Sequence, residues 1–129
     1  MYVPGGKPRG EYLASQLVME ALFLGAHDVC VQHVNGWWLV SSSSDWLVES
    51  SGEQLSILFS EIVPLPEAGD NSMRAEVLLT AFAQDVVTFR GRDLCVITGR
   101  ADVPEPVWQL VDHLRCLRMV AFRTNEPIS

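Results

Sequence analysis

The chain has 129 residues and a mass of 14.3 kDa, which is enough for one domain and too short for two ordinary ones. Hydrophobic residues make up 48% of it and charged residues 19%, so a disordered chain is excluded. Sixteen acidic against nine basic residues give a net charge of −7, which argues against a broad basic face for nucleic acid. We expect one domain over residues 1–129, with flexible ends at 1–10 and 124–129.

The cysteines and the apolar runs bear on where the protein acts. Cys30, Cys95 and Cys116 are odd in number and widely spaced, which does not fit a disulfide framework. No apolar run reaches the roughly 18–20 residues of a membrane span, and the first residues lack the basic-then-apolar pattern of a signal peptide. We therefore expect a reduced, cytoplasmic protein.

The first elements predicted along the chain are a helix and a β-hairpin. Apolar residues at three- and four-residue spacings favour a helix over residues 11–24, and Gly25 is placed to end it in a left-handed conformation. Asn35-Gly36 lies between two β-rich runs and is typical of a two-residue hairpin turn, because both turn residues tolerate positive φ. We expect the serine run 41–44 to leave the sheet, since serine builds little core.

A two-residue turn also predicts which residues face each other across the hairpin. It places His33 opposite Trp38, and Val31 opposite Val40. The later elements are expected at 53–62 (helix or strand), 63–71 (surface loop), 73–84 (helix), 86–89 with 94–98 (second hairpin), about 105–117 (helix, with Asp102 as a candidate cap) and 119–122 (closing strand). Two or three helices over one mostly antiparallel sheet make an α+β two-layer sandwich.

Two stretches of the chain carry a family resemblance. The first runs from Met1-Tyr2-Val3 through Arg9-Gly10, a helix with Gln16-Leu17-Val18-Met19-Glu20, Gly25-Ala26 and a strand, a turn and a strand. The second is the helical stretch 75–82. Together they cover about half of the chain and resemble the N-terminal region of the ATPase domain of the DNA gyrase B subunit and type II topoisomerases, in the GHKL superfamily. The resemblance ends after residue 84 and implies a truncated GHKL-like fold.

Two family positions on the first helix depart from the catalytic pattern. The resemblance implies that a glutamate general base belongs where Gln16 stands, and an amide cannot accept the proton of an attacking water at neutral pH. It implies a magnesium-binding asparagine where Glu20 stands, and a carboxylate can still bind that ion. We therefore expect a scaffold without turnover, and no bound cofactor.

The adenine and phosphate sites of the family are altered as well. The resemblance assigns Asp45 the role of receiving the adenine amino group, but bulky residues stand where the family has glycines that let the nucleotide approach. The glycine-rich lid that cradles the triphosphate is missing, since residues 84–89 lead straight into a strand. Residual ATP and magnesium binding through Gln16, Glu20 and Asp45 is the alternative.

Other residue groups point less clearly to a site. His113 and Cys116 lie three residues apart, but a closed zinc site needs about four ligands and the other candidates have no paired spacing. Serines 41–44, His33 and Asp45 are the residue types of nucleophilic catalysis, without the strand-turn-helix that would expose a nucleophile. We predict neither a metal site nor a catalytic one.

Tryptophans supply the candidate interface. Adjacent Trp37 and Trp38 point to opposite faces of a strand, so one of them can face outward, and Trp46 lies beside Asp45. Tryptophan is favoured at interface hot spots, although packing in the core is the commoner use of such a ring. We predict contacts with a protein partner or a second copy through the outward-facing members of this set.

Three functions follow. The first is a non-catalytic binding or regulatory module on the GHKL-like scaffold, which acts through protein contacts as a homo-oligomer. The second is a weak ATPase or ATP-binding domain. The third is an unrelated acidic inhibitor or immunity-type protein that mimics nucleic acid, which the net charge of −7 suits.

Overall fold

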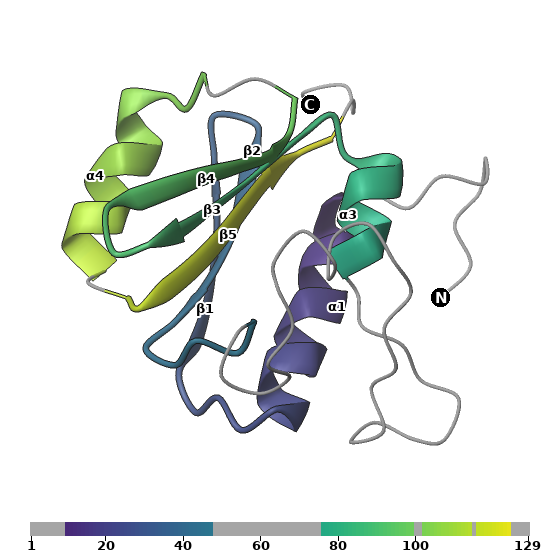
Figure 1. The fold of residues 1–129 in the computed structure, drawn as a ribbon, viewed down its shortest axis with the longest axis vertical. Helices are drawn as coiled ribbons and strands as arrows, with labels where there is room; N and C mark the ends of the chain where they lie inside the picture. The colour runs from purple at the N-terminus through teal and green to yellow at the C-terminus, as the bar shows by residue number, and fades with distance from the viewer. Residues whose placement is uncertain (1–9, 48–75, 100–101, 115, 125–129) are drawn as a thin grey trace.

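The computed structural model describes residues 10–47, 76–99, 102–114 and 116–124, and the expected elements at 53–62 and 63–71 and the residues at both ends lie outside these ranges (Figure 1). The described elements, in chain order, are α1 (Gly10–Phe23), β1 (Val29–Val34), β2 (Trp37–Ser42), α3 (Glu76–Phe82), β3 (Asp85–Arg90), β4 (Asp93–Thr98), α4 (Glu105–Leu114) and β5 (Arg118–Arg123).

The five strands form one sheet in the order β1-β2-β5-β3-β4, and every neighbouring pair is antiparallel. The last described strand, β5, therefore lies in the middle, between the two hairpins, and does not close an edge. Because β5 pairs with β2 on one side and β3 on the other, it joins the hairpins into one sheet. β1 and β4 are its edges.

The first hairpin has the predicted turn and register. Asn35 and Gly36 have φ of 52° and 81°, the left-handed values that such a turn requires. His33 pairs with Trp38, and Val31 with Val40, as expected. The helix before it also ends as predicted, since Gly25 has a φ of 98°.

The expectation that the serine run leaves the sheet was wrong for its first two residues. Ser41 and Ser42 lie in β2, each only 2% exposed, and pair with Met119 and Arg118 of the central strand. A hydroxyl can be buried where it finds a hydrogen-bond partner, and Ser42 Oγ donates to Asp28 Oδ1 at 3.1 Å. Serine composition alone therefore gave the wrong prediction, because pairing with β5 and the bond to Asp28 allow Ser42 to be buried in the sheet.

One side of the sheet, which we name the α1 face, is covered by α1 and α3 (Figure 1). Leu13, Leu17 and Ala21 recur along α1 at helical spacing and are buried, and Leu79 is their counterpart on α3. They pack on the alternate strand residues Val40, Val86, Val120 and Phe122.

The other side, the α4 face, has a second core. Val107 and Val111 of α4 lie one helical turn apart and are buried against Trp37, Leu39, Val87, Phe89, Met119 and Ala121. The helix begins at Glu105, three residues after the candidate cap Asp102. The α+β sandwich with an antiparallel sheet is confirmed. The helices lie on both faces of the sheet and not in one layer as expected, because α4 packs on the face opposite α1 and α3. Helical periodicity does not determine which face a helix covers.

Candidate functional site

The position that the resemblance links to adenine holds a buried ion pair. Asp45 follows β2 and is 1% exposed, and Arg118 at the start of β5 is 3% exposed. Arg118 Nε donates to Asp45 Oδ1 at 2.9 Å, and its Nη2 donates to Oδ2 at 2.8 Å. This bidentate geometry is the strongest hydrogen-bonding arrangement available to an arginine and a carboxylate.

Two further side chains complete this group. Arg118 Nη1 donates to the hydroxyl of Thr88 on β3, which is fully buried. Arg90, which is largely exposed, approaches Asp45 Oδ2 with its Nε at 3.7 Å. Both carboxylate oxygens of Asp45 therefore face arginines of the same chain. To accept an adenine amino group, this carboxylate would have to give up a bond to Arg118 inside the core.

The other two predicted nucleotide-binding residues lie on α1. Glu20 is buried among the apolar residues of the helix, whereas Gln16, one turn earlier, is half-buried. Residues four apart lie on the same side of a helix, so the two side chains share one side of α1. The structure thus brings Gln16 and Glu20 together on one element and places Asp45 in an ion pair with the central strand.

The three tryptophans predicted for an interface are mostly inside. Trp37 and Trp46 are each 1% exposed, in the cores of the α4 face and the α1 face respectively. Trp38 is half-buried, and the His33 ring stacks on it with centroids 4.0 Å apart and planes 8° apart. A Cβ added to Gly10 would lie 2.2 Å from Trp38 Nε1, so this indole packs directly on the start of α1. All three rings are used within the fold.

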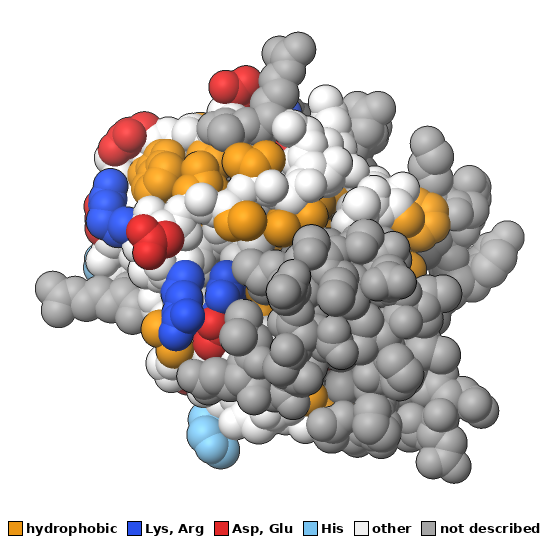
Figure 2. Space-filling view, viewed as in Figure 1, with side chains coloured by type: hydrophobic (Ala, Val, Ile, Leu, Met, Phe, Trp, Pro, Cys, Tyr) orange, Lys and Arg blue, Asp and Glu red, His pale blue; other side chains and the backbone are white. Residues whose placement is uncertain are grey.

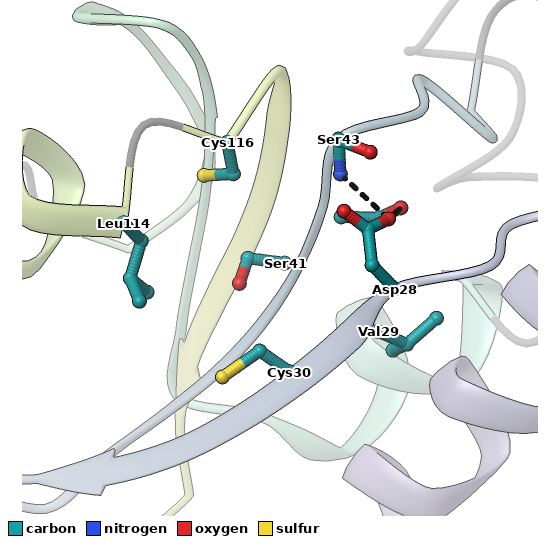
Figure 3. Close-up of a pocket in the computed structure, with 8 residues that line it drawn as sticks. Asp28, Val29, Cys30, Ser41, Ser43, Leu114 and Cys116 are labelled. Carbon is teal, nitrogen blue, oxygen red and sulfur yellow. Dashed lines mark hydrogen bonds between the residues drawn. The ribbon is translucent and has the colours of Figure 1, made fainter.

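A pocket of about 230 Å³ opens on the α4 face, beyond the end of α4 (Figure 3). Its lining joins β1, the end of β2 and the segment before β5, and comprises Asp28, Val29, Cys30, Ser41, Ser42, Ser43, Leu114 and Cys116. Figure 3 shows the thiols of Cys30 and Cys116 on either side of Ser41, with Asp28 at the Ser43 end. None of the three predicted nucleotide-binding residues lines it.

Two groups of this pocket, Asp28 and Cys116, have pKa values that the fold shifts away from their usual ranges. Hydrogen bonds from Ser43, whose backbone N donates to Asp28 Oδ1 at 3.2 Å, and from Ser42 hold the pKa of the Asp28 carboxyl below its usual range. Burial raises the pKa of the Cys116 thiol above its usual range. At neutral pH the pocket therefore combines a stable carboxylate with a protonated, weakly nucleophilic thiol.

Sequence reasoning missed this pocket, although one signal for it was present. The predicted hairpin register, continued by one step past Val29 and Ser42, puts Asp28 beside Ser43. What could not be read from the sequence is the approach of Cys116, because it depends on β5 lying next to β2.

Among the described residues, the remaining candidate groups do not come together as sites. His33 pairs with Trp38 near the turn, whereas Ser41 pairs with Cys30 toward the far end of the hairpin, so no histidine–serine pair forms there. Within the described ranges, no group of three or more His, Cys, Asp or Glu side chains is placed to hold a metal ion.

None of the described helices combines the length and apolarity needed to cross a bilayer. A scan against protein-family models and searches of curated proteins and of solved structures found no match to this chain. The GHKL and gyrase B resemblance accordingly stays a prediction carried by the residues quoted above.

Proposed function

We propose that this chain is a non-catalytic, protein-binding module on a scaffold related to the GHKL ATPase domain of the DNA gyrase B subunit. The observation that supports this most directly is the Asp45–Arg118 pair, whose four atoms meet at 2.8 and 2.9 Å inside the core. Opening it for a nucleotide would leave a buried guanidinium without its counter-charge, at a cost of about 3–5 kcal/mol. Adenine recognition by this carboxylate is therefore disfavoured.

Two other observations support the loss of nucleotide chemistry. Gln16 offers an amide at the position of the family's general base, and an amide does not take up a proton at pH 7. The pocket of about 230 Å³ lies on the α4 face, whereas Gln16 and Glu20 belong to a helix on the α1 face. What remains of the scaffold is a sheet with helices on both sides, which offers surfaces and edges to other proteins.

We place this activity in the cytoplasm, away from direct contact with nucleic acid. The three cysteines, all within the described residues, are free. The face in Figure 2 shows small groups of basic side chains with acidic ones beside them, and the chain carries a net charge of −7. Such a field repels phosphate backbones and favours protein partners.

The test is calorimetric titration of the full chain with ATP and magnesium, together with an assay of inorganic phosphate release. We expect no heat of binding and no phosphate above the protein-free blank. The Gln16→Glu variant restores the family's base and is the matched control. It is expected to remain inactive as well, because the Asp45 carboxylate stays paired with Arg118.

Magnesium-dependent heat or phosphate release from the wild-type chain that is lost on changing Gln16 or Glu20 would overturn the proposal and favour the residual ATPase. Adding the protein to a DNA gyrase supercoiling reaction tests the third function, an acidic protein that mimics nucleic acid. Such a mimic would inhibit the enzyme.

A further inference from the structure

The two edges of the sheet are protected unequally. β4 begins at the charged residue Asp93, and its register against β3 shifts at Val86/Val87, which marks a β-bulge. Charges and bulges are devices by which natural sheets prevent edge-to-edge pairing. β1 has neither, since its six residues, VCVQHV, carry no charge and no proline, and pair with β2 without a shift.

The turn determines which backbone groups of β1 point outward. Val34 and Trp37 flank a two-residue turn and therefore form a hydrogen-bonded pair. Bonding alternates along an antiparallel ladder, so the N–H and C=O groups of Cys30 and Gln32 also point toward β2. The bond from Leu117 N to Ser42 O, 3.0 Å long, agrees with this alternation, since it shows the Ser42 carbonyl turned away from β1.

The outward-pointing residues are consequently Val29, Val31 and His33, with six backbone groups between them. β1 lies at the end of the strand order, and no described strand pairs with this edge. Val31 is 42% exposed, a high value for valine at the centre of a strand. A regular, uncharged edge with an exposed valine at its centre is an open template for another strand.

We propose that the β1 edge binds the β1 edge of a second copy of this chain, in antiparallel register about a two-fold axis at Val31. The outward-pointing positions 29 and 33 lie at equal distances along the strand on either side of Val31. Val31 would exchange both hydrogen bonds with the partner's Val31, and Val29 would do so with the partner's His33. All six outward groups are thereby paired, and two five-stranded sheets become one continuous sheet of ten.

Charge is compatible with this register. Asp28, the nearest acidic residue to β1, would lie opposite the partner's Val34, so the two copies of Asp28 are about 20 Å apart and screened from each other. The net charge of −7 on each copy still opposes association at low ionic strength. We therefore expect the dimer to tighten as salt is added.

This inference rests on the proposed function only in that the module acts through protein contacts. Its test is independent of the nucleotide titration, since it measures association. Sedimentation velocity of the full chain is measured at concentrations from about 1 µM to about 1 mM. The monomer should give way to a dimer within these concentrations, because a small interface gives weak association. Backbone amides of Val29, Val31 and His33 should then exchange slowly with D₂O, although they point away from β2.

Two variants and a control locate the interface. Val31→Lys puts like charges opposite each other and should weaken the dimer at least about tenfold. Val31→Pro removes an N–H that faces away from β2, so it spares the fold's own ladder and should weaken the dimer about 30-fold by deleting two symmetric bonds. Val96→Lys changes a valine of nearly the same exposure, 40%, on the other edge and should leave the dimer unchanged.

Several outcomes would overturn the proposal. One is a wild-type chain that stays monomeric at every concentration, which would leave β1 for a strand of a different protein. Another is a dimer that survives Val31→Lys, or that Val96→Lys disrupts equally. If a β1 variant fails to fold by circular dichroism, amide exchange in the wild-type chain decides, because fast exchange at all three outward residues excludes pairing at this edge.

Discussion

The two faces of the sheet handle charge in opposite ways. On the α1 face, Asp45 and Arg118 are buried together, with side-chain exposures of 0% and 3%. On the α4 face, Asp85 is buried but its partner Arg123 is 38% exposed, and Arg92 and Asp112 pair in solvent at 65% and 55% exposure. The difference shows that the same kind of contact has different weight according to how much water the charged groups have lost.

Aromatic rings accompany the more exposed charges. Arg123 lies 5.5 Å from the centre of the Trp37 ring, and Arg92 lies 5.3 Å from that of Trp108. Trp108 in turn meets Phe89 edge to face at 5.0 Å. The α4 face therefore uses the apolar stems and planar heads of arginines to cover its aromatic core while the charge stays near water. On the α1 face the Arg118 guanidinium is buried away from water. Its charge therefore depends on Asp45 for compensation.

The largest effect is expected for Asp45→Asn. The neutral amide leaves the buried Arg118 guanidinium without counter-charge, so the free energy of unfolding should fall by about 3–5 kcal/mol. Chemical denaturation followed by circular dichroism measures it. The double variant Asp45→Leu with Arg118→Met removes both charges and should recover most of the loss. A single-variant loss below about 1 kcal/mol would contradict a closed ion pair here.

A smaller but still clear effect is expected for Gly99→Ala, at the residue directly after β4. A Cβ there would lie 2.1 Å from Asp85 Oδ1 and 2.7 Å from the Gln84 carbonyl, and the residue has a φ of 82°. Left-handed strain and the clash together should lower stability by about 2–4 kcal/mol. Gly91→Ala is the matched control, with a φ of 61° and open space around it, and should cost about 1 kcal/mol.

Asp85→Asn tests the half-exposed pair. Arg123 donates to Asp85 Oδ2 from Nε at 2.9 Å and from Nη2 at 2.5 Å. Since Arg123 retains access to water and to the Trp37 ring, we expect a loss of about 1–2 kcal/mol in thermal or chemical denaturation. A loss equal to that of Asp45→Asn would remove the distinction between the two faces.

The smallest effect is expected for Asp112→Asn. Its pair with Arg92 is exposed on both sides, and water screens the attraction between exposed charges, so such pairs contribute little to stability. The melting temperature should stay within experimental error of the wild type in 0.15 M salt. A shift comparable to that of Asp85→Asn would show that the Arg92 contact with Trp108 depends on this carboxylate.

Much of the local structure was predictable from local chemistry. Asn35-Gly36 predicted the turn and with it the pairs His33–Trp38 and Val31–Val40, and Gly25 predicted the end of α1. These succeed because a left-handed backbone conformation strongly restricts which residues stand there. The serine run was mispredicted because its burial depends on Asp28 and on β5, which come from elsewhere in the chain.

The candidate site was predictable only in part. Gln16 and Glu20 share the same side of a helix, as their four-residue spacing requires. The ion pair of Asp45 was not predictable, because its partner Arg118 is 73 residues away in the sequence and was not among the candidate residues. The tryptophans illustrate the same limit, since alternation places Trp37 and Trp38 on opposite faces but does not tell which helix covers each face.

Turn and helix signals act over a few residues, so the amino-acid order alone decides the end of α1, the first hairpin with its register, and the absence of charge along β1. The sheet order is different, because it arises when strands distant in the chain bury their faces together. Only that packing places β5 between the hairpins, brings Arg118 to Asp45 and puts α4 across the sheet from α1. The Asp45 carboxylate, which could have met a ligand, is paired with Arg118 there because an unpaired charge cannot remain in a dry core.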